Sequence, residues 1–213
     1  QMLNTVDRRA VGKLLKMNEL INLIIPRGGK SLIERVQKDS KIPVLSHLDG
    51  LCHTFIDKKA DKQMSLEIAL NAKMRRTGIC GATETLLCHK DSSQNILPEI
   101  ITKLIEKGCE VRGDKTVQSI NNNVKPASNK DWQTEYLDSI ISIKIVNDVF
   151  DAIEHIEKYG SNHTDAIITN NIRNAEIFLN NVNSAIVIHN ASTQYADGGE
   201  FGMGAEMGIA TGK

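Results

Sequence analysis

The sequence lacks an excess of charge of either sign. Its 26 lysines and arginines balance its 26 aspartates and glutamates, so the formal net charge at pH 7 is +0. A chain with balanced charge has no long-range attraction for polyanions, and we therefore expect neither nucleic acid nor a membrane as its partner. No apolar run approaches the ~20 residues that a membrane-spanning helix needs. The composition predicts a globular protein.

Cysteine is also scarce. The four cysteines, at positions 52, 80, 88 and 109, form no C-x-x-C pair and have no histidines at zinc-like spacing. We therefore expect no metal site. The first residues lack the basic-then-apolar layout of a secretory signal, so we expect reduced thiols and a cytoplasmic location.

Short apolar runs alternate with amphipathic stretches along the chain. Strands are predicted at 20–26, 43–48, 51–56, 83–89, 139–146, 164–170 and 184–190. Helices are predicted at 28–39, 60–76, 97–108, 147–160 and 171–181, the third with Pro98 in its first turn. The polar stretch 119–131 is expected to be a surface loop. Strands that alternate with helices predict an α/β fold with a largely parallel sheet.

The stretch MRRTGICGAT, residues 74–83, is the first candidate for chemistry. Cys80 lies between Gly78 and Gly81, just after a basic turn. Nearby positive charge lowers the pKa of a thiol, and glycines leave backbone N–H groups available to an oxyanion. The alternative is a buried structural cysteine, and these residues alone leave both possibilities open. The remaining cysteines lie in apolar contexts and are expected to be structural: Cys52, Cys88 and Cys109.

The stretch PRGGKS, residues 26–31, is a second candidate. A strand that runs into glycines and then a helix can present backbone N–H groups to phosphate. The stretch matches neither the dinucleotide fingerprint nor the P-loop, so a plain strand–helix turn is an equal alternative.

Two histidines in HIEKYGSNH, His155 and His163, are candidates of a third kind. Either could act as a general base. Alternatively, both pack at the junction between a helix and the following strand.

Four stretches together resemble one family, the gamma-glutamyl phosphate reductases of the aldehyde dehydrogenase superfamily. They are LIIPRGGKSLIERVQ, KMRRTGICGATETLL, VFDAIEHIEKYGSNHTDAIIT and NASTQYADGGEFGMGAEMGIATGK. The resemblance runs from about residue 5 to residue 213. It implies an aldehyde dehydrogenase-like α/β fold, in which helices flank the parallel sheet of the catalytic domain.

The resemblance also implies a reaction. Enzymes of this family reduce L-glutamyl 5-phosphate to glutamate 5-semialdehyde with NADPH, in proline biosynthesis. The cysteine that matches Cys80 attacks the acyl phosphate, expels phosphate and forms a thioester, which then accepts a hydride. Cys80 is thereby implied as the catalytic nucleophile, an acyl phosphate as the small-molecule substrate, and NADP(H) as the cofactor.

Further residues acquire roles through the same resemblance. Glu135 resembles the superfamily glutamate that holds the nicotinamide ribose, and its alternative is a charge on a surface helix. His47 stands where hydrolysing relatives place a glutamate that activates water, which a reductase must not do because hydrolysis would waste the thioester. His47 is then a proton donor or a structural histidine. The cofactor phosphates are assigned to Gly28, Gly29, Lys30 and Ser31.

The glycine-rich end of the chain resembles the loop that lines the family's substrate pocket. Candidates for holding the glutamyl group or the phosphate are Ser192, Thr193, Asp197, Gly198 and Gly199. The alternative is a glycine-rich surface loop.

The resemblance is to the C-terminal half of an enzyme about twice as long. We expect residues 1–58 to be the C-terminal part of a truncated NADP-binding domain, 59–190 to be the catalytic thiol domain, and 191–213 to be a truncated substrate-loop segment. Orphaned parallel strands expose an edge, so we expect a homo-oligomer or a complementing N-terminal half. The isolated chain is expected to have little or no activity. The alternative function is that of a non-catalytic remnant acting as a binding or interaction protein.

Overall fold

The computed structural model describes residues 2–212 and divides them into two compact units. The smaller unit contains the residues up to Leu48 together with those from Met207 onward, and the larger unit is Asp49–Glu206.

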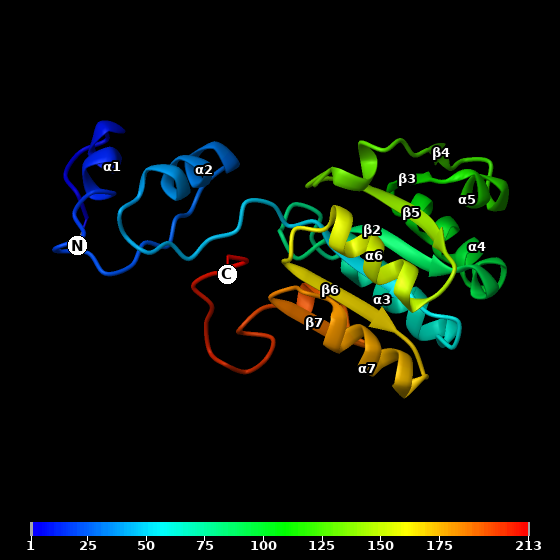
Figure 1. Ribbon diagram of the computed structural model, residues 1–213. Coiled ribbons are helices and arrows are strands. Elements are labelled where there is room, and N and C mark those ends of the chain that lie inside the picture. The colour runs from blue at the N-terminus through cyan, green and yellow to red at the C-terminus, as the bar shows by residue number, and fades with distance from the viewer. Residues whose placement is uncertain (1, 213) are drawn as a thin grey trace. The chain divides into compact units, whose positions relative to one another are not determined.

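A seven-stranded parallel sheet forms the centre of the larger unit, in the order β4-β3-β5-β2-β1-β6-β7 (Figure 1). The strands are β1 (Cys52–Ile56), β2 (Thr83–His89), β3 (Glu110–Gly113), β4 (Lys125–Pro126), β5 (Ile140–Val146), β6 (Thr164–Ile168) and β7 (Ile186–His189). Every residue of β1, β2 and β6 is buried, as expected for strands covered on both faces.

Helices cover both faces of this sheet: α3 (Lys62–Met74), α4 (Lys90–Glu106), α5 (Lys115–Ile120), α6 (Val149–Tyr159) and α7 (Ile172–Asn181). In Figure 1, α6 and α7 lie on the near face, and α3 lies on the far face. One core joins the sheet to α3, α4 and α5 through residues such as Leu86 and Ile100. The other joins it to α6 and α7, where the rings of Phe55 and Phe178 stack with centroids 6.3 Å apart. The predicted α/β class is confirmed.

Short polar side chains fix where four of these helices begin. Asp61, Asp114, Asp148 and Asn171 each accept hydrogen bonds from backbone N–H groups in the first turn of the helix that follows. Such caps satisfy N–H groups that have no partner within the helix.

One predicted helix boundary is wrong. The helix expected at 97–108 begins at Lys90, because His89 accepts a hydrogen bond from the N–H of Asp91 and caps it there. Pro98 therefore lies inside α4 rather than in its first turn. The carbonyl that Pro98 leaves without an intrahelical partner belongs to Gln94, which is exposed and can be solvated.

The polar stretch 119–131 was expected to be a surface loop, and only part of it is one. It contains the short strand β4 and the start of a 3₁₀ helix at Asp131–Gln133, and α5 ends within it. Two-residue strands and single helical turns carry no periodic apolar signal, which is why the pattern did not predict them.

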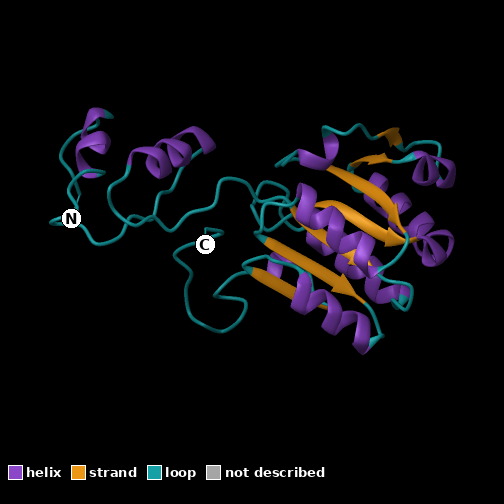
Figure 2. Cartoon of the chain, viewed as in Figure 1, coloured by secondary structure: helices purple, strands orange, loops and turns teal. Residues whose placement is uncertain are grey.

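The smaller unit contains two helices, α1 (Arg9–Leu14) and α2 (Lys30–Asp39), and is otherwise loop (Figure 2). In place of the strands predicted at 20–26 and 43–48, the structure has one parallel bridge, between Ile24 and Val44. Both segments have the apolar composition of buried strands, but within this unit each has only the other to pair with. The helix predicted at 28–39 is confirmed as α2.

Among the described residues, no helix combines the length and the apolar character that crossing a membrane requires.

Candidate active site

The candidate site of the larger unit lies at the amino edge of its sheet. Cys80 precedes β2, Gly50 precedes β1, Glu135 precedes β5 and His163 immediately precedes β6. Because these strands are parallel, their amino ends meet at one edge, and residues far apart in the sequence come together there.

Cys80 lies on a turn held closely by two other segments. A Cβ atom on Gly50 would lie 2.3 Å from the carbonyl oxygen and 2.5 Å from the Cα of Cys80, so only glycine fits there. A Cβ atom on Gly81 would lie 3.3 Å from the carbonyl oxygen of Thr193. The Cys80 turn therefore packs against both the entry to β1 and the loop after β7.

The four cysteines differ sharply in accessibility. Cys80 is half-buried, whereas Cys52, Cys88 and Cys109 are buried. Burial raises the pKa of Cys88 to about 12 and that of Cys109 to about 11. Burial, followed by the charges of Asp165 and Cys80, raises the pKa of Cys52 well above its usual range. These three thiols stay protonated at neutral pH, as predicted for structural cysteines.

Glu135 lies on a loop before β5, and not on a surface helix. Its Oε1 accepts a hydrogen bond from the N–H of Gly50 at 2.8 Å, next to the Cys80 turn. Two neighbours hold this loop: the Tyr136 hydroxyl donates to Asp131 at 2.8 Å, and the N–H of Leu137, whose φ is 51°, donates to Glu84 at 3.2 Å. The glutamate is therefore held by its own hydrogen bond and by those of the two residues that follow it.

A buried ion pair supports the same loop. Lys73 Nζ lies 2.5 Å from Glu84 Oε2, and both side chains are almost fully buried. The pKa of Glu84 is raised by burial, an effect that the neighbouring Lys73 opposes. Lys73 belongs to the basic turn expected to lower the pKa of Cys80, and the structure instead pairs its charge with Glu84. Gly50, Cys52 and Glu84 were not predicted as part of this site, because their contributions depend on tertiary contacts.

The two candidate histidines occupy different environments. A ring nitrogen of His163 lies within 4.8 Å of Cys80 Sγ. His155 instead packs against the rings of Trp132 and Tyr159 and receives a hydrogen bond from Lys144 at 3.0 Å. Burial, followed by the charges of His53, Lys144 and Lys158, lowers the pKa of His155 to about 2. His155 is therefore a neutral packing residue.

The predicted substrate residues fall into two groups within the larger unit. Ser192 and Thr193 are buried: the Ser192 hydroxyl accepts from the N–H of Gln194 at 3.2 Å, and the Thr193 hydroxyl lies 3.0 Å from that of Thr83. Their side chains are thus engaged inside the protein, beside Gly81.

The second group forms a turn. Asp197 Oδ1 accepts from the N–H of Gly199 at 2.7 Å, and the N–H of Gly198 donates to Glu206 at 3.2 Å. An ion pair between Arg75 and Glu200 ties this turn to the segment before Cys80.

The predicted phosphate residues lie together in the smaller unit. Gly29 is the N-cap of α2, and Lys30 and Ser31 are its first two residues. The φ of Gly28 is 154°, and a Cβ atom on Gly29 would meet nothing within 4 Å. Among the described residues, no side chain caps α2, and its first turn has no acidic residue. Such an open helix N-terminus is chemically suited to an anion.

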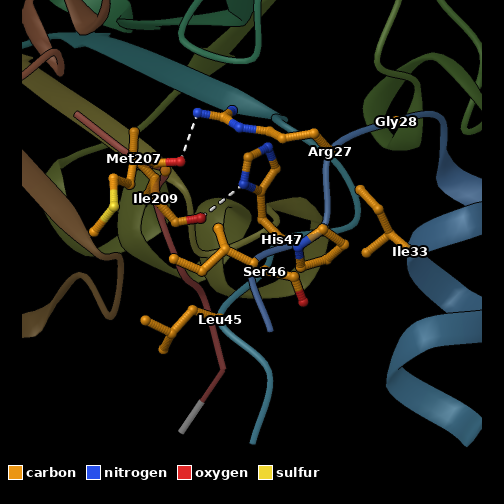
Figure 3. Close-up of a pocket in the computed structure, with 11 residues that line it drawn as sticks. Arg27, Gly28, Ile33, Leu45, Ser46, His47, Met207 and Ile209 are labelled. Atoms are coloured by element: carbon orange, nitrogen blue, oxygen red, sulfur yellow. Dashed lines mark hydrogen bonds between the residues drawn. The ribbon is translucent and has the colours of Figure 1, made fainter. Parts of the chain in front are cut away.

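A pocket of about 100 Å³ adjoins this turn within the smaller unit (Figure 3). Two hydrogen bonds shape it: Arg27 Nη2 donates to the carbonyl of Met207 at 2.6 Å, and His47 Nδ1 donates to that of Ile209 at 2.8 Å. Because a carbonyl can only accept, Nδ1 of His47 carries the hydrogen. The wall is completed by apolar side chains: Ile25, Pro26, Ile33 and Leu45.

Comparison with known proteins gives close relatives. The gamma-glutamyl phosphate reductase of Paramagnetospirillum magneticum is 56% identical over 213 residues, which are 100% of this chain and 50% of the relative. The crystal structure of gamma-glutamyl phosphate reductase from Thermotoga maritima has a TM-score of 0.96 and 43% identity, covering 99% of this chain and 51% of that one. The chain thus spans about half the length of the relatives it matches. No family model matches it.

More distant structures share the fold. An acetylating aldehyde dehydrogenase from Geobacillus thermoglucosidasius is 16% identical with a TM-score of 0.73, covering 97% of this chain and 54% of that one. The glyceraldehyde-3-phosphate dehydrogenase GapN of Methanocaldococcus jannaschii, solved with NADP, is 17% identical with a TM-score of 0.68, covering 86% and 49%. The expected aldehyde dehydrogenase-like fold is confirmed.

Proposed function

The chain belongs to the gamma-glutamyl phosphate reductase family, and from this premise we propose that it carries the thiol chemistry of an acyl phosphate reductase. The substrate is L-glutamyl 5-phosphate, the product is glutamate 5-semialdehyde, and the pathway is proline biosynthesis. Cys80 is the nucleophile.

The accessibility of Cys80 carries this proposal. It is half-buried at the edge of the sheet, while the other three thiols are buried and have raised pKa values. The thiolate is the attacking species, so Cys80 is the cysteine suited to attack at neutral pH.

The chemistry follows from the substrate. Cys80 Sγ forms a bond to the acyl carbon, the bond from that carbon to the phosphate oxygen breaks, and phosphate leaves with the electron pair. Reduction of the thioester then gives a tetrahedral adduct on Cys80, whose C–S bond breaks to release the aldehyde. The tight packing of the Cys80 turn against Gly50 keeps the sulfur in place through both steps.

NADPH, when bound, supplies the hydride for that reduction. The residues of the smaller unit fit its phosphates, because α2 presents an uncapped N-terminus, two glycines and Lys30. We assign the cofactor phosphates to Gly28, Gly29, Lys30 and Ser31, and the nicotinamide ribose to Glu135.

The glycine-rich loop is assigned to the substrate. Ser192 and Thr193 shape the wall beside Gly81, since their hydroxyls are engaged internally. The turn of Asp197, Gly198 and Gly199, tied to the segment before Cys80, faces the glutamyl group.

The chain matches half of each relative, and we propose that a second polypeptide or segment corresponding to the other half completes the cofactor site. The alternative is a non-catalytic remnant. The close fit of the Cys80 turn at Gly50 and Gly81 favours the enzyme half, because a remnant has no need to keep a nucleophile between glycines.

The test is the reverse reaction, with glutamate semialdehyde, phosphate and NADP⁺, followed by the appearance of NADPH. It is run on the chain alone and with the unmatched half of the Paramagnetospirillum relative added. We expect phosphate-dependent turnover in the mixture, abolished by Cys80→Ser. Turnover that survives Cys80→Ser overturns the assignment of the nucleophile.

A second readout needs no cofactor. The chain is incubated with acetyl phosphate, and peptide mass spectrometry locates the acyl group. We expect a hydroxylamine-sensitive acyl group on Cys80 and none in Cys80→Ser. A folded chain that shows neither acylation nor turnover supports the remnant.

A further inference from the structure

His163 is a buried histidine beside the nucleophile. It follows Asn162, whose φ is 59°, and it immediately precedes β6 at the amino edge of the sheet. Its side chain is fully buried, and one of its ring nitrogens lies within 4.8 Å of Cys80 Sγ. A buried imidazole this near a reactive thiol has a short path for exchanging a proton with it.

The contacts of the ring fix its orientation. Nδ1 of His163 lies 3.0 Å from the Thr164 hydroxyl and 3.6 Å from Cys52 Sγ. The Cys52 thiol donates its single hydrogen to the carbonyl of Cys80 at 3.0 Å. Its sulfur can meet Nδ1 only as an acceptor, whereas the Thr164 hydroxyl can donate to Nδ1 or accept from it, so these contacts hold the ring in place while either nitrogen carries the hydrogen of the neutral form.

The carboxylates on β6 and on β2 are bound to other side chains. Asp165 on β6 binds His53 at 3.0 Å and the hydroxyl of Ser184 at 2.5 Å. Glu84 on β2 pairs with Lys73. Each of these carboxylates is thus hydrogen-bonded to a side chain other than that of His163.

We propose that His163 exchanges a proton with Cys80 and that Cys52 positions the Cys80 turn through its hydrogen bond. This inference rests on the proposed function. The Cys80 thiol gives its proton to His163, the thiolate forms the C–S bond, and the C–O bond to phosphate breaks. The departing phosphate takes the electron pair and then the proton held by His163, so the thioester forms with a neutral imidazole.

The test is the pH profile of alkylation of Cys80 by iodoacetamide, with peptide mass spectrometry to assign the label. It reads the thiolate directly and needs neither substrate nor cofactor. An ordinary thiol of pKa ~8.5 is about 1% thiolate at pH ~6.5. We expect the unaltered chain to react at least about 10-fold faster than His163→Gln at that pH, with the rates converging above pH ~9.

His163→Gln keeps a hydrogen-bonding side chain but cannot take up a proton from the thiol. Circular dichroism checks that the variant folds. His155→Gln is the matched control, since it also replaces a buried histidine of the same unit, and its profile should equal that of the unaltered chain. Cys52→Ser keeps a donor to the carbonyl of Cys80 and should change the profile less than Cys52→Ala does.

Identical profiles for the unaltered chain and His163→Gln overturn the proposal, whatever the turnover assay gives. Replacing His47, the other histidine weighed as a proton donor, gives the competing outcome: if His47→Gln alone shifts the profile, the proton belongs to His47. A profile that depends on His163 without acylation by acetyl phosphate means that the pair exists but the reductase assignment fails.

Discussion

Gly50 shows how a residue without a side chain can define a reactive site. Any Cβ at this position would overlap the backbone of Cys80, which cannot move without shifting the whole turn. The N–H of Gly50 also donates a hydrogen bond to Glu135, which ties the candidate cofactor residue to the turn of the candidate nucleophile. One glycine thus connects two residues that the sequence assigned separate roles.

We predict that Gly50→Ala destabilises the larger unit by about 1–3 kcal/mol, as overpacking of a tight contact does. Alkylation of Cys80 should also slow, because the turn is displaced. Chemical denaturation and the alkylation rate measure the two effects. Gly78→Ala is the control in the same unit, since the nearest atom to its new Cβ is the Leu137 carbonyl oxygen at 3.8 Å, an ordinary contact that should leave the free energy of unfolding nearly unchanged. Equal losses for the two variants would contradict the steric explanation.

The buried ion pair of Lys73 and Glu84 gives a second prediction at the scale of single residues. Breaking a buried pair leaves a buried charge, so Lys73→Met should cost about 3–5 kcal/mol at pH ~8. The pKa of Glu84 is already raised in the folded chain, and losing Lys73 raises it further. A protein whose folded state raises the pKa of a carboxyl group becomes less stable as the pH rises above the ordinary pKa of that group.

The loss caused by Lys73→Met should therefore shrink as the pH falls towards the ordinary pKa of a glutamate, because the raised pKa of Glu84 lets it take up a proton above that pH. Urea unfolding at several pH values checks this. Lys73→Met combined with Glu84→Gln should recover much of the loss at high pH. A loss that is the same at all pH values would mean that packing, and not charge, dominates.

At the scale of elements, the sequence predicted the sheet of the larger unit better than its details. The structure has a strand within each of the predicted ranges 51–56, 83–89, 139–146, 164–170 and 184–190, because each range contains the apolar or β-branched residues typical of a parallel strand between two layers of helices. The start of α4 was missed because Pro98 gave a stronger signal than the histidine cap at His89. The segments 20–26 and 43–48 were predicted to be strands but share one bridge, because apolar composition does not show how many strands will lie beside a segment.

The site was predictable only where a motif marked it. Cys80 was a candidate from the basic turn and the glycines around it, while its role and that of Glu135 came from the resemblance. The structure places both at one edge of the sheet. His163 and His155 could not be separated by sequence, since both lie near a helix–strand junction. Their difference arises from tertiary packing: one lies beside two thiols, the other beside two aromatic rings.

At the scale of the whole molecule, the smaller unit leaves large apolar side chains in solvent. Leu20 is 75% exposed and Leu23 is 43% exposed. Exposed apolar groups of this size favour association, in line with the expectation of an oligomer or a complementing half.

We predict that Leu20→Ser with Leu23→Ser weakens self-association, or the binding of the added half, as measured by sedimentation velocity. Leu179→Ser, at an exposed leucine of the larger unit, is the matched control and should have no such effect. A chain that stays monomeric and binds the half equally well in both variants would contradict the prediction. The predicted boundaries at residues 58 and 190 stay predictions.

The amino-edge arrangement also has a consequence for how the chain folds. Gly50, Cys80, Glu135 and His163 come from four separate segments, and they meet only when β1, β2, β5 and β6 have paired. Such pairings are distant in sequence and close slowly, whereas helices form early. During refolding, the mature reactivity of Cys80 should therefore lag behind the recovery of helical signal. The reactivity of Cys80 therefore reports when the sheet is complete.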